Sequence, residues 1–309
     1  MLPTRQGSIR LFRVAGIDVF LHWLWFLAPV YIVTLGGKRY SSLVWNVLEV
    51  LCLFAIVLMH EFGHALACRQ VGGKADYIIL WPLGGVAYVA PPQRPGATLW
   101  SIAAGPLVNV VLAPLFTVLY ILARQFGWED ALPDLYRFVE SIWIVNFVLL
   151  FFNLLPIYPL DGGQILRALL WFFIGKGRSL MVASIIGFIG VPVVMLAAIF
   201  GHSASLGVMA VFIMFNCWRG LLQARMIAKM AKLPRRTEFA CPSCKQPPIA
   251  GPFWICHRCR ARFDTFETNA ICPNCGEEFP MTRCLECGEA HPMPDWRAAG
   301  YAPTPPPLP

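Results

Sequence analysis

The chain has 309 residues, of which 57% are hydrophobic and only 14% are charged, and its formal net charge is +8. Soluble globular proteins contain about 25% charged residues. Together with a mean hydropathy of +0.60, this composition excludes an ordinary soluble protein and indicates a multi-pass membrane protein. The basic residues lie between apolar stretches and in the C-terminal part, which is typical of membrane topology and lipid headgroup contacts.

Six apolar stretches are long enough to cross a bilayer, which takes about 20 residues. We expect spans at residues 17–36, 43–67, 98–123, 139–157, 180–200 and 204–227. The first is expected to be a retained span and not a signal peptide, because no small-residue cleavage site follows it. An even number of spans puts both termini on one side. The Lys and Arg residues after the second, fourth and last spans predict that this side is the cytosol. If the source is bacterial, the membrane is the cell (inner) membrane.

The second stretch contains a His-Glu-x-x-His motif, His60-Glu61-Phe62-Gly63-His64. Residues four apart share one face of a helix, so His60 and His64 can direct their imidazoles at one metal ion. With Glu61 beside them, this arrangement is typical of a zinc site with a general base. An exposed charged helix face is the alternative, but ionisable groups at bilayer depth are costly and usually functional.

Residues 75–90 connect the second and third stretches and are too few to cross as a helix. β-forming residues flank Gly84 and Gly85, which predicts a hairpin or a bent edge strand. At membrane depth such a segment must lie against protein or a wet cavity. A plain surface loop is the alternative.

Asp161 follows the fourth stretch and is the only carboxylate between Ser141 and Phe173. A zinc site with two histidines needs a third protein ligand. Because the second and fourth spans are both expected to run inward, Asp161 reaches the depth of the motif. We therefore predict that Asp161 is the third ligand, with a helix N-cap as the alternative.

Three of the asparagines in the apolar stretches are candidates for a role at or near the site. Asn153 is placed to donate a hydrogen bond to a developing oxyanion. Asn109 and Asn146 are expected to form hydrogen bonds between helices. His22, next to Trp23, is expected to be an interfacial residue and not a ligand.

The chain contains eleven cysteines. Cys52, Cys68 and Cys217 are isolated and are expected to be packing residues. The other eight form four Cys-x-x-Cys pairs at Cys241, Cys244, Cys256, Cys259, Cys272, Cys275, Cys284 and Cys287. They suffice for two structural zinc sites, and metal-binding thiolates suit a reducing compartment. Neighbouring pairs may combine in order, the middle two inside the outer two, or the first with the third, and a redox role is the alternative.

Three groups of residues together resemble the site-2 protease family of intramembrane zinc metalloproteases. They are residues 60–64, the Gly84-Gly85 segment with residues 105–109 after it, and residues 153–163. The resemblance covers roughly residues 9–225. The sensory modules common in that family are not evident, and the cysteine-rich segment takes their place.

The resemblance implies that His60, His64 and Asp161 bind a catalytic zinc ion and that Glu61 is the catalytic base. It implies that Asn153 helps to stabilise the transition state. It also implies that the hairpin, with Gly84 and Gly85, binds an unwound substrate segment by strand addition. The cofactors are then one catalytic zinc ion and two structural ones.

The predicted fold class is an all-α polytopic membrane protein of about six transmembrane helices, with a membrane-associated β-hairpin and a small zinc-ribbon domain. We expect a transmembrane metalloprotease domain at 1–232, a linker at 233–240, a double zinc ribbon at 241–296 and a disordered Pro-rich tail at 297–309.

The predicted function is a zinc metalloendopeptidase that cleaves in or near transmembrane segments of membrane-protein substrates, as in regulated intramembrane proteolysis. An inactive relative that binds membrane helices and recruits partners is the alternative, and a metal transporter is a further one. We expect the lipid bilayer and a protein bound by the ribbons as partners. Nucleic acid is not expected, because the charged residues within 272–295 are mainly acidic.

Overall fold

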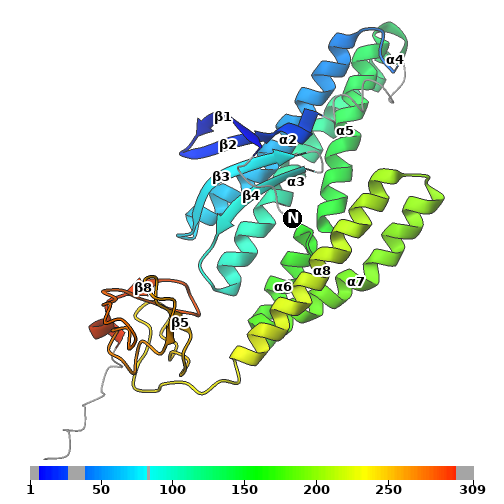
Figure 1. The fold of residues 1–309 in the computed structure, drawn as a ribbon. Helices are drawn as coiled ribbons and strands as arrows, with labels where there is room; N and C mark the ends of the chain where they lie inside the picture. Colours follow the sequence, from blue (N-terminus) through cyan, green and yellow to red (C-terminus); the bar gives the residue numbers. More distant parts are fainter. Residues whose placement is uncertain (1–6, 27–38, 82–83, 297–309) are drawn as a thin grey trace, which may run out of the picture. The chain divides into compact units, whose positions relative to one another are not determined.

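The computed structural model describes residues 7–26, 39–81 and 84–296, apart from the side chain of residue 205. The chain divides into two compact units, Met1–Ala224 and Arg225–Pro309, which are considered separately. The helices that begin in the first unit are α2 (Leu43–Gln70), α3 (Pro95–Gln125), α4 (Trp128–Ala131), α5 (Pro133–Leu154), α6 (Asp161–Ile174), α7 (Lys176–Phe200) and α8 (Ala204–Met230) (Figure 1).

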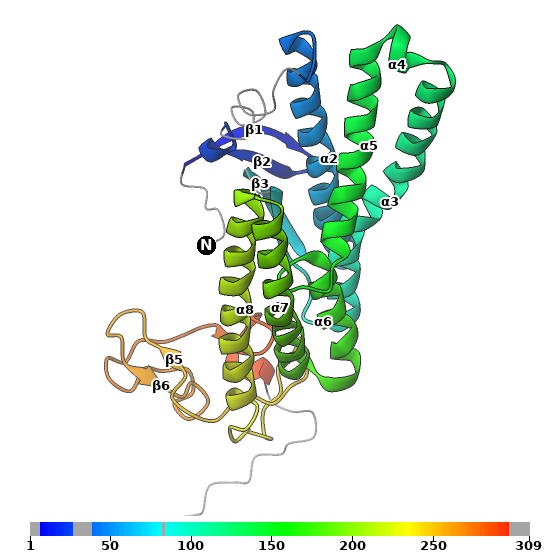
Figure 2. The ribbon, with the colours of Figure 1, turned by 90° about the vertical axis from the view of Figure 1, so that its right-hand side faces the viewer.

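Five helices among the described residues are long and apolar enough to cross a membrane, namely α2, α3, α5, α7 and residues 206–230 of α8. They coincide with the last five expected spans and confirm the helical membrane fold class. The helices α7 and α8 lie side by side (Figure 2) and share a core of Val191, Val194, Ala210, Ile213 and Cys217. The shorter α6 has 14 residues and follows the break in the helical chain after α5.

The first expected span, residues 17–36, does not begin as a helix. Ile17–His22 forms strand β2 and Trp23–Phe26 forms the short 3-10 helix η1, while residues 27–36 lie outside the described residues. Alternate residues of β2 are fully buried, which is the period of a strand with one covered face. The helix prediction was wrong over residues 17–22 because it counted apolar residues and missed this alternation.

β2 belongs to a four-stranded sheet with β1 (Ser8–Val14), β3 (Lys74–Trp81) and β4 (Gly84–Ala90), in the order β1-β2-β3-β4. β2 and β3 are parallel, and the other two pairs are antiparallel. β3 and β4 therefore form the expected hairpin, and β4 is an edge strand. The two glycines begin β4, where Gly84 lies opposite Trp81 and Gly85 opposite Leu80.

The sheet packs against the second half of α2 (Figure 1). The buried residues of β2 and β3 contact Ala65 and Cys68 of that helix. Arg69, in the last turn of α2, donates hydrogen bonds to the backbone oxygens of Ala15, Gly16 and Ala75. One guanidinium thereby ties the β1–β2 turn and β3 to the end of α2.

α2 and α3 approach closely at Gly63. A Cβ atom at this position would lie 2.6 Å from the carbonyl oxygen of Ala104. Small residues let helix backbones meet inside a membrane, where close packing replaces the hydrophobic effect as the cause of association. This approach brings Ser101 and Asn109 of α3 to the histidine side of α2.

The second unit contains two short β-ribbons. One pairs β5 (Trp254–Ile255) with β6 (Arg262–Phe263), and the other pairs β7 (Thr282–Arg283) with β8 (Ala290–His291). The 3-10 helix η2 (Met293–Trp296) ends in the fully buried Trp296, which packs with Phe266 and the outer cysteines.

An ion pair lies inside this second unit. Arg236 contacts Asp264 at 2.8 Å, and the side chain of Asp264 is only 2% exposed. The hydrogen bond to Asp264 raises the pKa of the Arg236 guanidinium, so this group stays charged.

Candidate metal centre

His60 and His64 lie one turn apart on α2 and are buried, with exposed fractions of 3% and 6%. Their Nε2 atoms are 3.1 Å apart. The helical spacing of the motif therefore places both rings on the covered face of α2.

Asp161 comes to the same point from the start of α6. Its Oδ2 lies 3.0 Å from Nε2 of His60 and 3.3 Å from Nε2 of His64. Leu160, and not Asp161, is the N-cap of α6, and no side chain caps this helix. The two prolines before Asp161 end α5 and let the chain turn, so the N-cap alternative does not hold.

The partners of the two imidazoles fix where their protons lie. His64 Nδ1 is 2.9 Å from the carbonyl oxygen of Ser101, which can only accept. His60 Nδ1 is 2.7 Å from Oδ1 of Asn109, whose amide nitrogen donates to Asn146 at 2.9 Å. In the neutral rings both Nδ1 atoms therefore donate, and both Nε2 lone pairs point at Asp161.

This donor set fits a zinc ion. Zinc–ligand bonds of about 2.0–2.1 Å in a tetrahedral arrangement place neighbouring ligand atoms about 3.4 Å apart. The three distances among the two Nε2 atoms and Oδ2 are 3.0, 3.1 and 3.3 Å. Three converging lone pairs repel one another unless a cation lies between them, so His60, His64 and Asp161 form a competent site for one zinc ion.

Glu61 lies between the two histidines in sequence and is 6% exposed. Its Oε2 accepts a hydrogen bond from the backbone N–H of Ala87 in β4, at 2.7 Å. A Cβ atom on Gly85 would lie 2.7 Å from its Oε1. The carboxylate is therefore enclosed by the edge strand of the sheet.

The two expected interhelical asparagines form one buried network with the site. Asn109 and Asn146 have no exposed surface. Asn146 donates to the backbone oxygen of Asn109 at 3.1 Å and accepts from its side chain. The expected bonding between helices is present, and it extends to His60, which the sequence reasoning missed. Asn153, half-buried in the last turn of α5, stays a prediction as an oxyanion donor.

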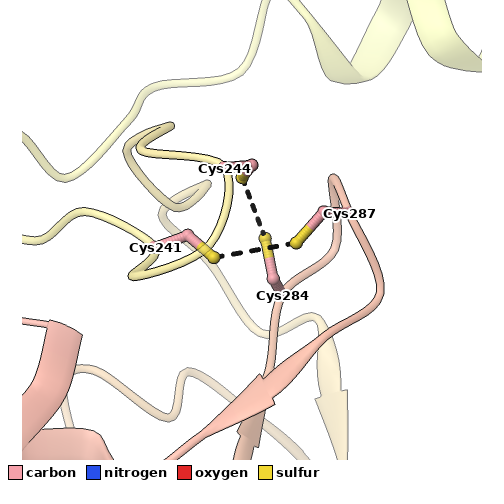
Figure 3. A group of neighbouring side chains, drawn as sticks. All are labelled: Cys241, Cys244, Cys284 and Cys287. Carbon is pink, nitrogen blue, oxygen red and sulfur yellow. Dashed lines mark hydrogen bonds between the residues drawn. The ribbon is translucent and has the colours of Figure 1, made fainter. Parts of the chain in front are cut away.

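The cysteine pairs of the second unit combine as the middle two and the outer two. Sγ of Cys241 lies 3.7 Å from that of Cys287, and Sγ of Cys244 lies 3.8 Å from that of Cys284 (Figure 3). In the inner group, Cys256–Cys275 and Cys259–Cys272 are each 3.6 Å apart. Bonds of about 2.3 Å to a tetrahedral zinc ion give sulfur–sulfur distances of about 3.8 Å, so both clusters fit Cys₄ zinc sites.

All four Cys-x-x-Cys pairs have the same backbone turn. The first cysteine donates its N–H to the carbonyl five residues later and accepts from the N–H four residues later. The residue at that fourth position has positive φ in each turn, namely Lys245, Arg260, Gly276 and Gly288. The repeat shows four equivalent knuckles.

A His-Glu-x-x-His helix and a carboxylate converge inside a bundle of apolar helices, which is the arrangement expected of a membrane metalloprotease. The sequence profile of peptidase family M50 matches residues 48–136 and 121–197. Zinc metalloprotease MJ0392 of Methanocaldococcus jannaschii is 37% identical over 180 residues, covering 58% of this chain and 50% of that protein. Putative zinc metalloprotease YwhC of Bacillus subtilis is 42% identical over 150 residues, covering 39% and 68%.

The solved structure of the Site-2 Protease from Methanocaldococcus jannaschii matches with a TM-score of 0.50 and 30% identity, covering 69% of this chain and 95% of that one. The chain therefore belongs to peptidase family M50, the site-2 protease family, and the resemblance seen in the sequence is confirmed. It spans about half the length of MJ0392 and similar relatives.

Proposed function

We propose that this chain is a zinc-dependent endopeptidase that hydrolyses peptide bonds in or near transmembrane segments of membrane-protein substrates. The observation that supports this best is the convergence of His60, His64 and Asp161 on one point beside Glu61, within the apolar helices. A binding protein or a transporter has no use for a buried carboxylate next to such a site.

The proposed mechanism assigns a task to each side chain. His60, His64 and Asp161 would hold a zinc ion, which would supply an activated water with a pKa near 7 and polarise the scissile carbonyl. Glu61 accepts the proton of the nucleophile and returns it to the leaving amine. Asn153 donates to the oxygen on which negative charge develops.

The edge strand β4 is the proposed docking element for the substrate. In a transmembrane helix the carbonyl groups are occupied by intrahelical hydrogen bonds, so the segment to be cut must first extend. Among the residues that the structure describes, β4 has a neighbour on one side only, β3. Its other edge can pair with an extended segment by strand addition, and Gly84 and Gly85 lie at the start of that edge.

We propose that the chain lies in the cell (inner) membrane and that both of its termini face the cytosol. Trp25 contacts Phe54 in the middle of α2, whereas Tyr40 stacks on Trp45 near its start. Trp25 and Tyr40 therefore lie beside different turns of α2, and Arg69 and Lys74 at its other end support a start of α2 on the outer side. Fusing a reporter that is active only outside the cytosol after residue 41 should give signal, and the same fusion at the C-terminus should give none.

The double ribbon is proposed to bind two structural zinc ions and a protein partner. Its few β-pairs and small core would not suffice without metal. Zinc counting tests this assignment: we expect about three ions per chain for the wild type, about two for His60→Ala and about one without residues 234–309.

The catalytic assignment is tested with purified protein in detergent and a single-span substrate, with and without chelator. Glu61→Gln should retain its zinc and lose cleavage, by about 10²–10⁴-fold for a general base. Glu140→Gln, in α5, is the matched control and should cleave normally. Cleavage that survives Glu61→Gln would eliminate Glu61 as the base, whereas a wild type that binds substrate without cutting it would favour the inactive-relative alternative.

A further inference from the structure

The edge strand β4 contacts the predicted general base through its backbone. The Ala87 N–H donates to Oε2 of Glu61 at 2.7 Å. Two residues earlier, a Cβ atom on Gly85 would lie 2.3 Å from Cγ and 2.7 Å from Cδ of the same side chain. Glu61 thus occupies the space left by the missing side chain of Gly85 and is hydrogen-bonded by the next amide on that side of the strand.

The direction of the Ala87 amide shows which edge of β4 makes this contact. Successive N–H groups of a strand point to opposite sides. β4 pairs with β3, where Ala87 lies opposite Ile78, yet the Ala87 amide donates to a helix residue and therefore points away from β3. It belongs to the row of amides that an added strand would use.

We propose that β4 positions the general base, with the Ala87 amide orienting the Glu61 carboxylate and Gly85 leaving the room that it needs. The role of Glu61 as base rests on the proposed function. A substrate segment that pairs with β4 is then brought beside Glu61 by the same strand that orients it. Gly85, expected to bind substrate, becomes a positioning residue.

The side chain of Glu61 needs such a partner. Its position in α2 fixes only its Cα atom, and three side-chain torsions remain free. A carboxylate that accepts a charge-assisted hydrogen bond from a rigid backbone amide keeps one orientation. Because the donor belongs to the sheet, and Arg69 of α2 also donates to Ala75 of the neighbouring β3, the base and the docking edge are held in one arrangement.

The decisive experiment replaces the Ala87 amide by an ester, through incorporation of lactic acid at residue 87 of the full chain. This change removes the N–H and keeps the shape of the strand. An ester at Leu11, in the strand at the opposite edge of the sheet, is the matched control. Zinc content, kcat and KM are measured on a single-span substrate.

We expect the ester at residue 87 to lower kcat about tenfold to a hundredfold, within the range set by loss of the base itself, with KM within about twofold and zinc unchanged. Gly85→Ala should lower kcat similarly. A rise in KM alone would show that this amide serves substrate pairing only. An unchanged or raised kcat would show that the contact does not position the base. Either result overturns the proposal.

A second measurement does not depend on turnover. Hydrogen exchange of the Ala87 amide should accelerate in Glu61→Ala and remain slow in Glu140→Ala. If the wild type cuts no substrate, the proposed function fails while this exchange result still decides whether β4 and Glu61 are coupled. Equal exchange in both variants overturns the coupling.

Discussion

Replacing Asn109 by leucine should weaken zinc binding at the membrane site. The Asn109 side chain accepts from Nδ1 of His60 at 2.7 Å and donates to Asn146 at 2.9 Å. It therefore fixes both the ring orientation and the proton of His60. In Asn109→Leu the imidazole is free to rotate and to carry its proton on Nε2, the atom that binds the metal.

The expected magnitude follows from these two bonds. Loss of a partner that orients a metal-binding histidine costs about 10–100-fold in metal affinity, which equals about 1.4–2.7 kcal/mol. Buried groups left unpaired cost about 1–3 kcal/mol each, but polar pairs between membrane helices average only about 0.6 kcal/mol. We therefore expect the variant to remain folded and the zinc affinity to fall.

The assay is zinc competition with a chromophoric chelator on the full chain in detergent, where only the membrane site should shift. Asn109→Asp still accepts from His60 and should retain most of the affinity. Asn216→Leu removes an asparagine that bonds within α8, to Phe212 at 2.8 Å, and is the matched control. An unchanged midpoint in Asn109→Leu would refute the argument.

Three further outcomes are expected. Gly105→Ala should abolish zinc binding at the membrane site, because its Cβ would lie 2.2 Å from Nε2 of His64. Gly96→Ala is the control, since its Cβ would meet Phe172 at 3.8 Å, and it should keep its zinc. Zinc counting measures both. Arg260→Gly should raise the free energy of unfolding of the ribbon unit by about 1 kcal/mol, as thermal denaturation will measure, because φ is +62° at this residue. Cys284→Ser should lose one zinc ion per chain and unfold its ribbon, as followed by the fluorescence of the buried Trp296.

The parts of the site that could be predicted from sequence are those with a local or chemical constraint. The four-residue spacing of His60 and His64 fixes their common face in any helix. Asp161 was found because a zinc site needs a third ligand and Asp161 is the only carboxylate between Ser141 and Phe173. The four knuckles were found because each is defined by its own spacing.

The pairing of the knuckles could not be predicted, because all four have the same local pattern. Loop closure favours pairing in order, since Cys244 and Cys284 are 40 residues apart and Cys256 is only 12 residues from Cys244. This difference is worth only about 1 kcal/mol. Burial of Trp296 and Phe266 against the outer cysteines outweighs it, and that packing has no sequence signature.

The contacts that orient the motif side chains come from other elements, and two of the three are backbone groups. The Ser101 carbonyl orients His64, the Ala87 amide orients Glu61, and only Asn109, which orients His60, has a side chain that a sequence can display. Backbone groups occur at every position, so an intact His-Glu-x-x-His motif does not guarantee them. A chain with every motif residue but a shifted β4 would bind zinc and cleave about tenfold to a hundredfold more slowly. The rate of cleavage therefore depends on the Ala87 amide in addition to Glu61 itself.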